Sequence, residues 1–178
     1  ALNKAEDDIE ETQKLVIGTS TCSREDWVRT RAFAWMAGLL YFNKIAQIPI
    51  LTMYEHFGIK YRELFEAFSE DTLGPKFPII NEVREFFRNK ALAIQNGGYE
   101  FCNSPEYLNI SWPPEEYVLI KLYAEGKLDA FYKETLMAFE LILRAKNTPD
   151  DTGIIADAIQ LNQNLLKLPF QKSHRSLK

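Results

Sequence analysis

Apolar residues recur at intervals of three and four along most of the chain, which is the spacing of helices that bury one face. A first helix is predicted to begin at Ser23, because a serine followed three positions later by Asp26 has the form of a capping box. From Ala32 to Phe42 no residue carries a formal charge. A helix that is apolar on every side is surrounded by other helices, so this segment is expected to be central.

Six further helical segments follow, separated by glycine and proline residues that end or begin helices. They run from Pro49 to Phe57, from Tyr61 to Phe68, from Phe77 to Gln95, from Pro113 to Gly126, from Lys127 to Arg144 and from Ile154 to Leu168. The stretch from Tyr99 to Ser111 is expected to be an irregular loop. The predicted fold class is therefore all-α, an irregular bundle of about seven helices.

The same pattern divides the chain into three parts. Residues 1–22 form a polar lead-in or arm, in which Leu15–Ile17 is a short apolar run of uncertain structure. Residues 23–170 form the helical domain, and residues 171–178 form a polar tail. A chain of 178 residues that is 46% hydrophobic can build one core without disulfides or metals. The start at Ala1, without a methionine, hints at a fragment of a longer protein.

Charge and cysteine content narrow the classes of function. The net charge is −4 and the isoelectric point is near 5.3, which argues against a nucleic-acid partner. No apolar run is long enough to span a membrane, and the acidic opening is unlike a signal peptide, so no membrane association is predicted. Cys22 and Cys102 are far apart and belong to no CxxC motif, which predicts reduced thiols in a cytoplasmic protein.

Two residues invite a catalytic interpretation. His56 stands one position after Glu55 and has the chemistry of a general base or a metal ligand, but a structural role at the end of a helix is favoured. Cys22, close to a helix N-terminus, has the chemistry of a nucleophile. No histidine lies near it in the sequence, so an inert thiol is the favoured interpretation.

No metal site is predicted. Helical di-iron proteins use Glu-x-x-His pairs, and the sequence contains none. The acids Glu82 and Glu85 are read as the solvated face of an amphipathic helix. Gly97 and Gly98 follow a helix rather than a strand, so they do not form a phosphate-binding loop.

Three arginines and two tryptophans gather in the first helix, namely Arg24, Arg29, Arg31, Trp27 and Trp35. Guanidinium groups and indole rings together can clamp an anion or stack on a planar ligand. Ion pairs within the helix, to Glu25 and Asp26, are the simpler explanation and the one favoured.

Three stretches carry a family resemblance: "TSTCSREDWVRTRAFAWMAGLLYF", "KIAQIPILTMYEHFGIKYRELFEAF" and "LNQNLLKLPF". In their residues and in their order along the chain, they resemble the region that follows the barrel in cobalamin-binding radical S-adenosylmethionine (SAM) enzymes. The resemblance covers Thr19–Phe68 and Leu161–Phe170. The family's cluster motif CxxxCxxC is absent, and His56 departs from its cobalamin motif DxHxxG, since Tyr54 replaces the aspartate and Gly58 comes one position early.

The resemblance implies a non-catalytic, C-terminal accessory domain that packs against the barrel of the same polypeptide. The parent enzyme, a methyltransferase or iron–sulfur oxidoreductase, would use SAM, a 4Fe-4S cluster and cobalamin, and this chain would hold none of them. Residues facing the barrel or the substrate would be Arg24, Trp27, Arg31, Trp35 and Tyr41. Excision should leave part of the aromatic side of the first helix exposed. The alternatives are a free-standing helical interaction module and a small enzyme that uses His56 or Cys22.

Overall fold

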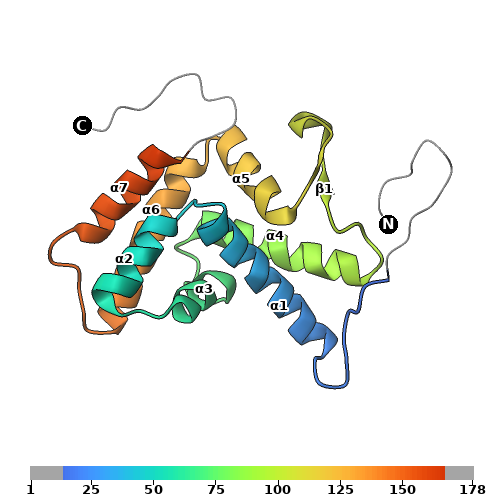
Figure 1. The fold of residues 1–178 in the computed structure, drawn as a ribbon, viewed down its shortest axis with the longest axis horizontal. Helices are drawn as coiled ribbons and strands as arrows, with labels where there is room; N and C mark the ends of the chain where they lie inside the picture. The colour runs from blue at the N-terminus through green and yellow to red at the C-terminus, as the bar shows by residue number, and fades with distance from the viewer. Residues whose placement is uncertain (1–13, 167–178) are drawn as a thin grey trace.

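A computed structural model describes residues 14–166 (Figure 1). Within that range it contains seven α-helices: α1 (Arg24–Ala37), α2 (Gln47–Phe57), α3 (Tyr61–Ser69), α4 (Pro78–Gln95), α5 (Pro114–Ala124), α6 (Leu128–Ala145) and α7 (Ile154–Leu165). The predicted all-α class is confirmed. The expected end of the last helix at Leu168 and the tail 171–178 lie outside the described residues. Leu15–Ile17 forms neither helix nor strand.

The first helix begins where the sequence predicts. The Ser23 hydroxyl accepts a hydrogen bond from the backbone N–H of Asp26 at 3.0 Å, and the Asp26 carboxylate accepts one from the N–H of Ser23 at 3.3 Å. This reciprocal pair is a capping box, which satisfies two N–H groups that have no partner within the helix.

The helix does not continue as an α-helix to Phe42, so that expectation is wrong. After Ala37 the backbone widens into a π-helical turn, η1 (Gly38–Phe42), in which the N–H of Asn43 donates to the carbonyl of Gly38 at 2.8 Å. A Cβ atom at Gly38 would lie 3.2 Å from Cγ of Glu115 in α5. The close approach of α5 therefore accompanies the change of helix type.

The segment from Tyr99 to Ser111 contains more order than an irregular loop. Strand β1 (Cys102–Asn103) pairs antiparallel with β2 (Ser111–Trp112), and a short 3₁₀ turn, η2 (Pro105–Tyr107), lies between them. Leu108 and Asn109 take left-handed backbone conformations, with φ of 64° and 52°, and reverse the chain. The resulting hairpin projects beyond α5 (Figure 1).

The core lies between two groups of helices. α1 packs along α4, and α2 packs along α7 with α6 beside them (Figure 1). The bulkiest fully buried side chains are aromatic: Phe68, Phe87, Phe131 and Phe139. α2 begins at Gln47, two residues before the predicted Pro49, whose missing N–H is tolerated in a first helical turn.

Three buried or half-buried polar side chains fix the ends of helices. Glu134 of α6 accepts hydrogen bonds from the first N–H groups of α4, and Asp150 accepts hydrogen bonds from the first N–H groups of α7. Asn162 of α7 bonds to the backbone on both sides of the start of α2. The contacts of Glu134 and Asn162 join elements that are far apart in the sequence, so they define how the helices pack, whereas those of Asp150 are local.

Candidate functional site

The structure brings together three of the residues that the resemblance singles out. The guanidinium carbon of Arg31 lies 5.1 Å from the ring centroid of Trp35 and 6.0 Å from that of Trp27. Arg31 also forms an ion pair with Glu100, which precedes the hairpin. Trp35 is buried, whereas Trp27 and Arg31 are half-buried. A cation held over indole rings is stabilised by their π electrons, so these contacts are consistent with a structural role for Arg31.

A half-buried carboxylate lies behind this cluster. Burial raises the pKa of Glu115, and the positive charge of Arg31 opposes that rise. Within the described residues, Oε2 of Glu115 and Nε of Arg31 are both buried without a hydrogen-bond partner. Each atom therefore retains capacity for one further hydrogen bond.

The other arginines of the first helix bind partners different from those expected. Arg24 donates to the backbone carbonyl of Gln95 at 3.2 Å, and Arg29 donates to Glu70 at 2.9 Å. Of the predicted pairs within the helix, Arg29 approaches Asp26 only at 4.0 Å. The preference for ion pairs to Glu25 and Asp26 is thus wrong for Arg24 and Arg31. Their partners come from segments distant in the sequence.

Tyr41 lies apart from the tryptophans, in a second cluster that we call the aromatic surface. Its members come from α1, η1, α2 and α3, and they are Phe33, Tyr41, Phe42, Tyr54, Tyr61 and Phe65. The ring of Tyr41 packs edge-on against Phe42, Tyr61 and Phe65, with centroid distances between 5.5 and 6.5 Å. Tyr54 stacks on Tyr61 at 4.5 Å.

The aromatic surface is open to solvent. Phe42 is 75% exposed and Tyr54 is also exposed, while the other four members are half-buried. The expectation that the aromatic side of the first helix stays partly uncovered agrees with this arrangement. Contiguous exposed aromatic side chains are typical of contact sites on proteins.

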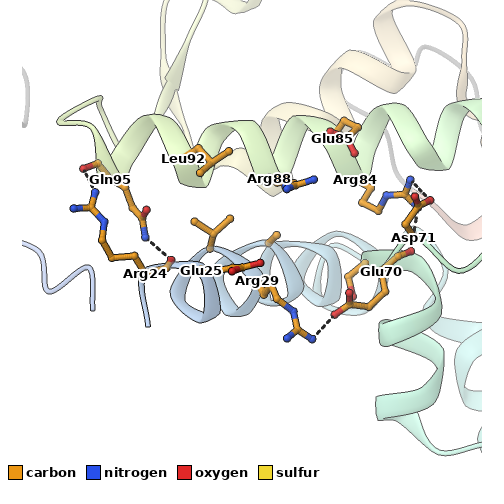
Figure 2. A pocket seen from close by; sticks show the side chains of 13 residues that line it. Arg24, Glu25, Arg29, Glu70, Asp71, Arg84, Glu85, Arg88, Leu92 and Gln95 are labelled. Carbon is orange, nitrogen blue, oxygen red and sulfur yellow. Dashed lines mark hydrogen bonds and ion pairs between the residues drawn. The ribbon is translucent and has the colours of Figure 1, made fainter. Parts of the chain in front are cut away.

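A pocket of about 660 Å³ lies between α1, the end of α3 and α4 (Figure 2). Its walls carry charged side chains from both long helices, and its floor is formed by the apolar residues Val28, Ala32 and Leu92. At one end Arg84 donates to Asp71 at 2.8 Å and to the carbonyl of Glu70 at 3.0 Å. Charged side chains from α1, from α4 and from the residues that follow α3 thus meet in one pocket.

The residues considered for catalysis are not brought together. His56 is exposed in the last turn of α2 and touches the neighbouring Phe57 ring, and Cys22 contacts the carbonyl of Ser23. Glu82 accepts hydrogen bonds from Lys127, which lower its pKa, rather than facing solvent alone. In the part of the chain that the structure describes, no group of three or more His, Cys, Asp or Glu side chains has the arrangement of a metal site.

Comparison of the chain with protein-family models, with curated proteins and with solved structures finds no match. Among the described residues, no helix is both long enough and apolar enough to cross a bilayer.

Several residues of these sites escape sequence reasoning. Tyr61 and Phe65 recur at helical spacing, which is equally the signal of a buried face, and Tyr54 belongs to the preceding helix. Arg84 and Arg88 of α4 are four positions apart and so share one face of their helix, but nothing in the sequence pairs that face with α1. Only the packing of α1 on α4 makes a pocket of them.

Proposed function

We propose that this chain is a non-catalytic helical accessory domain that docks through its aromatic surface onto the barrel of a cobalamin-dependent radical SAM enzyme, within the same polypeptide. The observation that supports docking is the exposure of Phe42, whose side chain is 75% exposed and lies among five other aromatic residues. An exposed phenylalanine in a contiguous aromatic cluster removes much apolar surface from water on contact.

The choice of partner depends on the resemblance. All six members of the aromatic surface fall within Thr19–Phe68, the segment that resembles the region following the barrel. The cofactors of the parent enzyme would remain with its other domains, and its reaction would be methyl transfer or iron–sulfur redox chemistry. Cys22 and Cys102 are both free thiols, which supports a reducing, cytoplasmic setting.

A second candidate function uses the same surface. As a free-standing interaction module, the chain would bind a separate protein through the aromatic surface, as helices do when their apolar faces are laid in a partner's groove. The two functions differ in whether the partner is part of the same polypeptide, and one experiment distinguishes them.

The test is site-specific photocrosslinking in the complete gene product. A benzoylphenylalanine placed at Phe42 should crosslink to the barrel segment that carries CxxxCxxC, as mapped by mass spectrometry of the digest. The matched control is the same probe at Tyr123, an exposed aromatic position on α5. Crosslinks to a separate protein would establish the interaction module instead. If Phe42 yields no more crosslinks than Tyr123, neither function uses this surface.

A further inference from the structure

The pocket between α1 and α4 has the dimensions of a small-molecule site. Its volume of about 660 Å³ falls within the range of roughly 300–1,000 Å³ that is typical of ligand pockets. The apolar floor includes Leu92, which is 39% exposed and so offers surface to a ligand. Arg24 and Gln95 close one end through two hydrogen bonds, at 3.2 and 2.6 Å, that join the two helices.

The charges at the other end of the pocket are already neutralised. Arg84 is paired with Asp71, and Arg29 is paired with Glu70 at 2.9 Å. Each of these ion pairs is neutral as a whole, so neither attracts a charged ligand strongly. Recognition must therefore come from the remaining side chains.

Four charged side chains of the pocket form no ion pair of 4.0 Å or less within the described residues: Arg24, Arg88, Glu25 and Glu85. Glu25 is close enough to Arg29 for its charge to help raise the pKa of that arginine, but Arg29 pairs directly with Glu70. The hydrogen bonds of Arg24 join it to Gln95, which is uncharged. Arg88 of α4 and Glu25 of α1 stand on opposite walls of the pocket, with no bond between them (Figure 2). An arginine without an ion pair thus faces a carboxylate that accepts no hydrogen bond from a cation, across an apolar floor.

We infer that this pocket binds an apolar α-amino acid, or a molecule built on one, in its zwitterionic form. Arg88 binds the carboxylate, because the planar guanidinium matches a carboxylate with two parallel hydrogen bonds. Glu25 accepts hydrogen bonds from the ammonium group, and the apolar side chain lies on the floor over Leu92.

The pocket holds two acidic and two basic side chains without ion pairs, and this balance favours a zwitterion over a simple anion or a simple cation. Glu25 and Glu85 repel an inorganic anion such as phosphate, and Arg24 and Arg88 repel a simple amine. A zwitterion meets both kinds of partner at once. The pocket is also larger than a single amino acid, which leaves room for a larger body attached to it.

The experiment is a titration of the full chain by amide NMR with three matched ligands. They are L-phenylalanine, phenylalaninamide, which lacks the carboxylate, and 3-phenylpropionate, which lacks the ammonium group. L-phenylalanine should give saturable shifts at residues around the pocket, and each analogue should bind about tenfold more weakly or worse, since one charge-assisted hydrogen-bonded contact is lost. Inorganic phosphate should produce no saturable shift there.

Variants test the assigned residues. Arg88→Gln and Glu25→Gln, both at exposed positions, should each weaken L-phenylalanine binding about tenfold, by the same reasoning. Arg62→Gln and Glu140→Gln are the matched controls, since their side chains pair with Glu66 and Arg144 outside this pocket, and they should bind as the wild type does. Absence of saturable binding at millimolar L-phenylalanine, equal binding of all three ligands, tighter binding of phosphate, or unchanged affinity in Arg88→Gln would each overturn the assignment.

Discussion

The carboxylate of Glu134 on α6 accepts two hydrogen bonds from the backbone N–H of Ile79, both at 3.0 Å, and one from the N–H of Ile80 at 2.9 Å. These N–H groups belong to the first turn of α4 and have no partner within their own helix. Glu134 is only 8% exposed. The side chain therefore acts as an N-terminal cap supplied by another helix.

Replacing Glu134 by alanine should lower the free energy of unfolding by about 2 kcal/mol or more, because the substitution leaves buried N–H groups without acceptors. Urea denaturation followed by circular dichroism measures this loss. The control is Glu140→Ala, at an acid of the same helix that pairs with Arg144 near solvent and should change stability by less than about 0.5 kcal/mol. Equal effects of the two substitutions would refute the capping role.

Asn162 is the corresponding anchor for α2. It is 3% exposed, its Oδ1 accepts from the N–H of Ile48 at 2.9 Å, and its Nδ2 donates to the carbonyls of Lys44 and Ile45 at 3.0 and 2.8 Å. Asn162→Leu should cost about 2–4 kcal/mol, since backbone groups lose their partners and the larger side chain must be repacked. Thermal unfolding of this variant beside Asn164→Leu, at a half-buried position of the same helix, checks the expectation. A smaller loss at 162 than at 164 would contradict it.

Asp150 should make stability depend on acid pH. Burial raises the pKa of this carboxyl, but hydrogen bonds from the N–H groups of Ile155 and Ile154 and from Thr152 outweigh it, so the net pKa is lowered. The contribution to stability is then fully present above the unfolded pKa of about 3.9, and it is lost as pH falls through the lower folded pKa.

Asparagine can also accept hydrogen bonds from the first N–H groups of a helix, so Asp150→Asn should cost less than about 1 kcal/mol at pH 7, the usual value of a lost cap, and less still as the pH approaches 2. Urea unfolding at a series of pH values measures the difference from the wild type. Asp151→Asn, at the exposed neighbouring position, is the control. A difference that stays constant down to the lowest pH would show that the charge of Asp150 is irrelevant.

Glu115 should make stability depend on pH in the opposite direction to Asp150. Because burial raises its folded pKa, its protonated form favours folding below the unfolded pKa of about 4.3, and this advantage is lost as pH rises through the folded pKa. Glu115→Gln removes the cost of a buried charge, so the variant should gain stability relative to the wild type between pH 4 and pH 7. Denaturation at both pH values, with Glu140→Gln as control, is the measurement. No relative gain on going to pH 7 would disprove this account.

Phe42→Ser should reduce self-association without loss of stability. The side chain is mostly exposed, so its removal should change the free energy of unfolding by less than about 0.5 kcal/mol. Sedimentation velocity at high concentration should show more monomer for this variant than for the wild type or for Tyr123→Ser. Sedimentation identical to that of the wild type would argue that the aromatic surface makes no contacts between copies.

Local signals account for most of the fold. Ser23 with Asp26 predicts the start of the first helix, and Gly58, with φ of 68°, ends α2 where the sequence places its stop. The π-helical turn at Gly38 occurs where Glu115 of α5 approaches closely, and the hairpin depends on pairing between Cys102 and Trp112. Such contacts join distant parts of the chain and leave no periodic signal, so sequence reasoning missed both.

The sites follow the same rule. Trp27, Arg31 and Trp35 are four positions apart in succession, so their shared helix face is evident from the sequence. The ion pair between Arg31 and Glu100 is not evident from the sequence, because Glu100 follows α4 and is far from Arg31 along the chain. Arg88 and Glu25 belong to different helices, and only the packing of those helices places them across one pocket.

The π-helical turn at Gly38–Phe42 also sets the rotational phase of the side chains that follow it. In an α-helix each residue advances by about 100° around the axis, and a wider turn contains one residue more than the α-helical turn it replaces. Deleting a single residue from this turn would restore the α-helix and rotate every later side chain by one such step. Tyr41 would then leave Tyr61 and Phe65 of α3, and the aromatic surface would be divided although no aromatic residue had been removed.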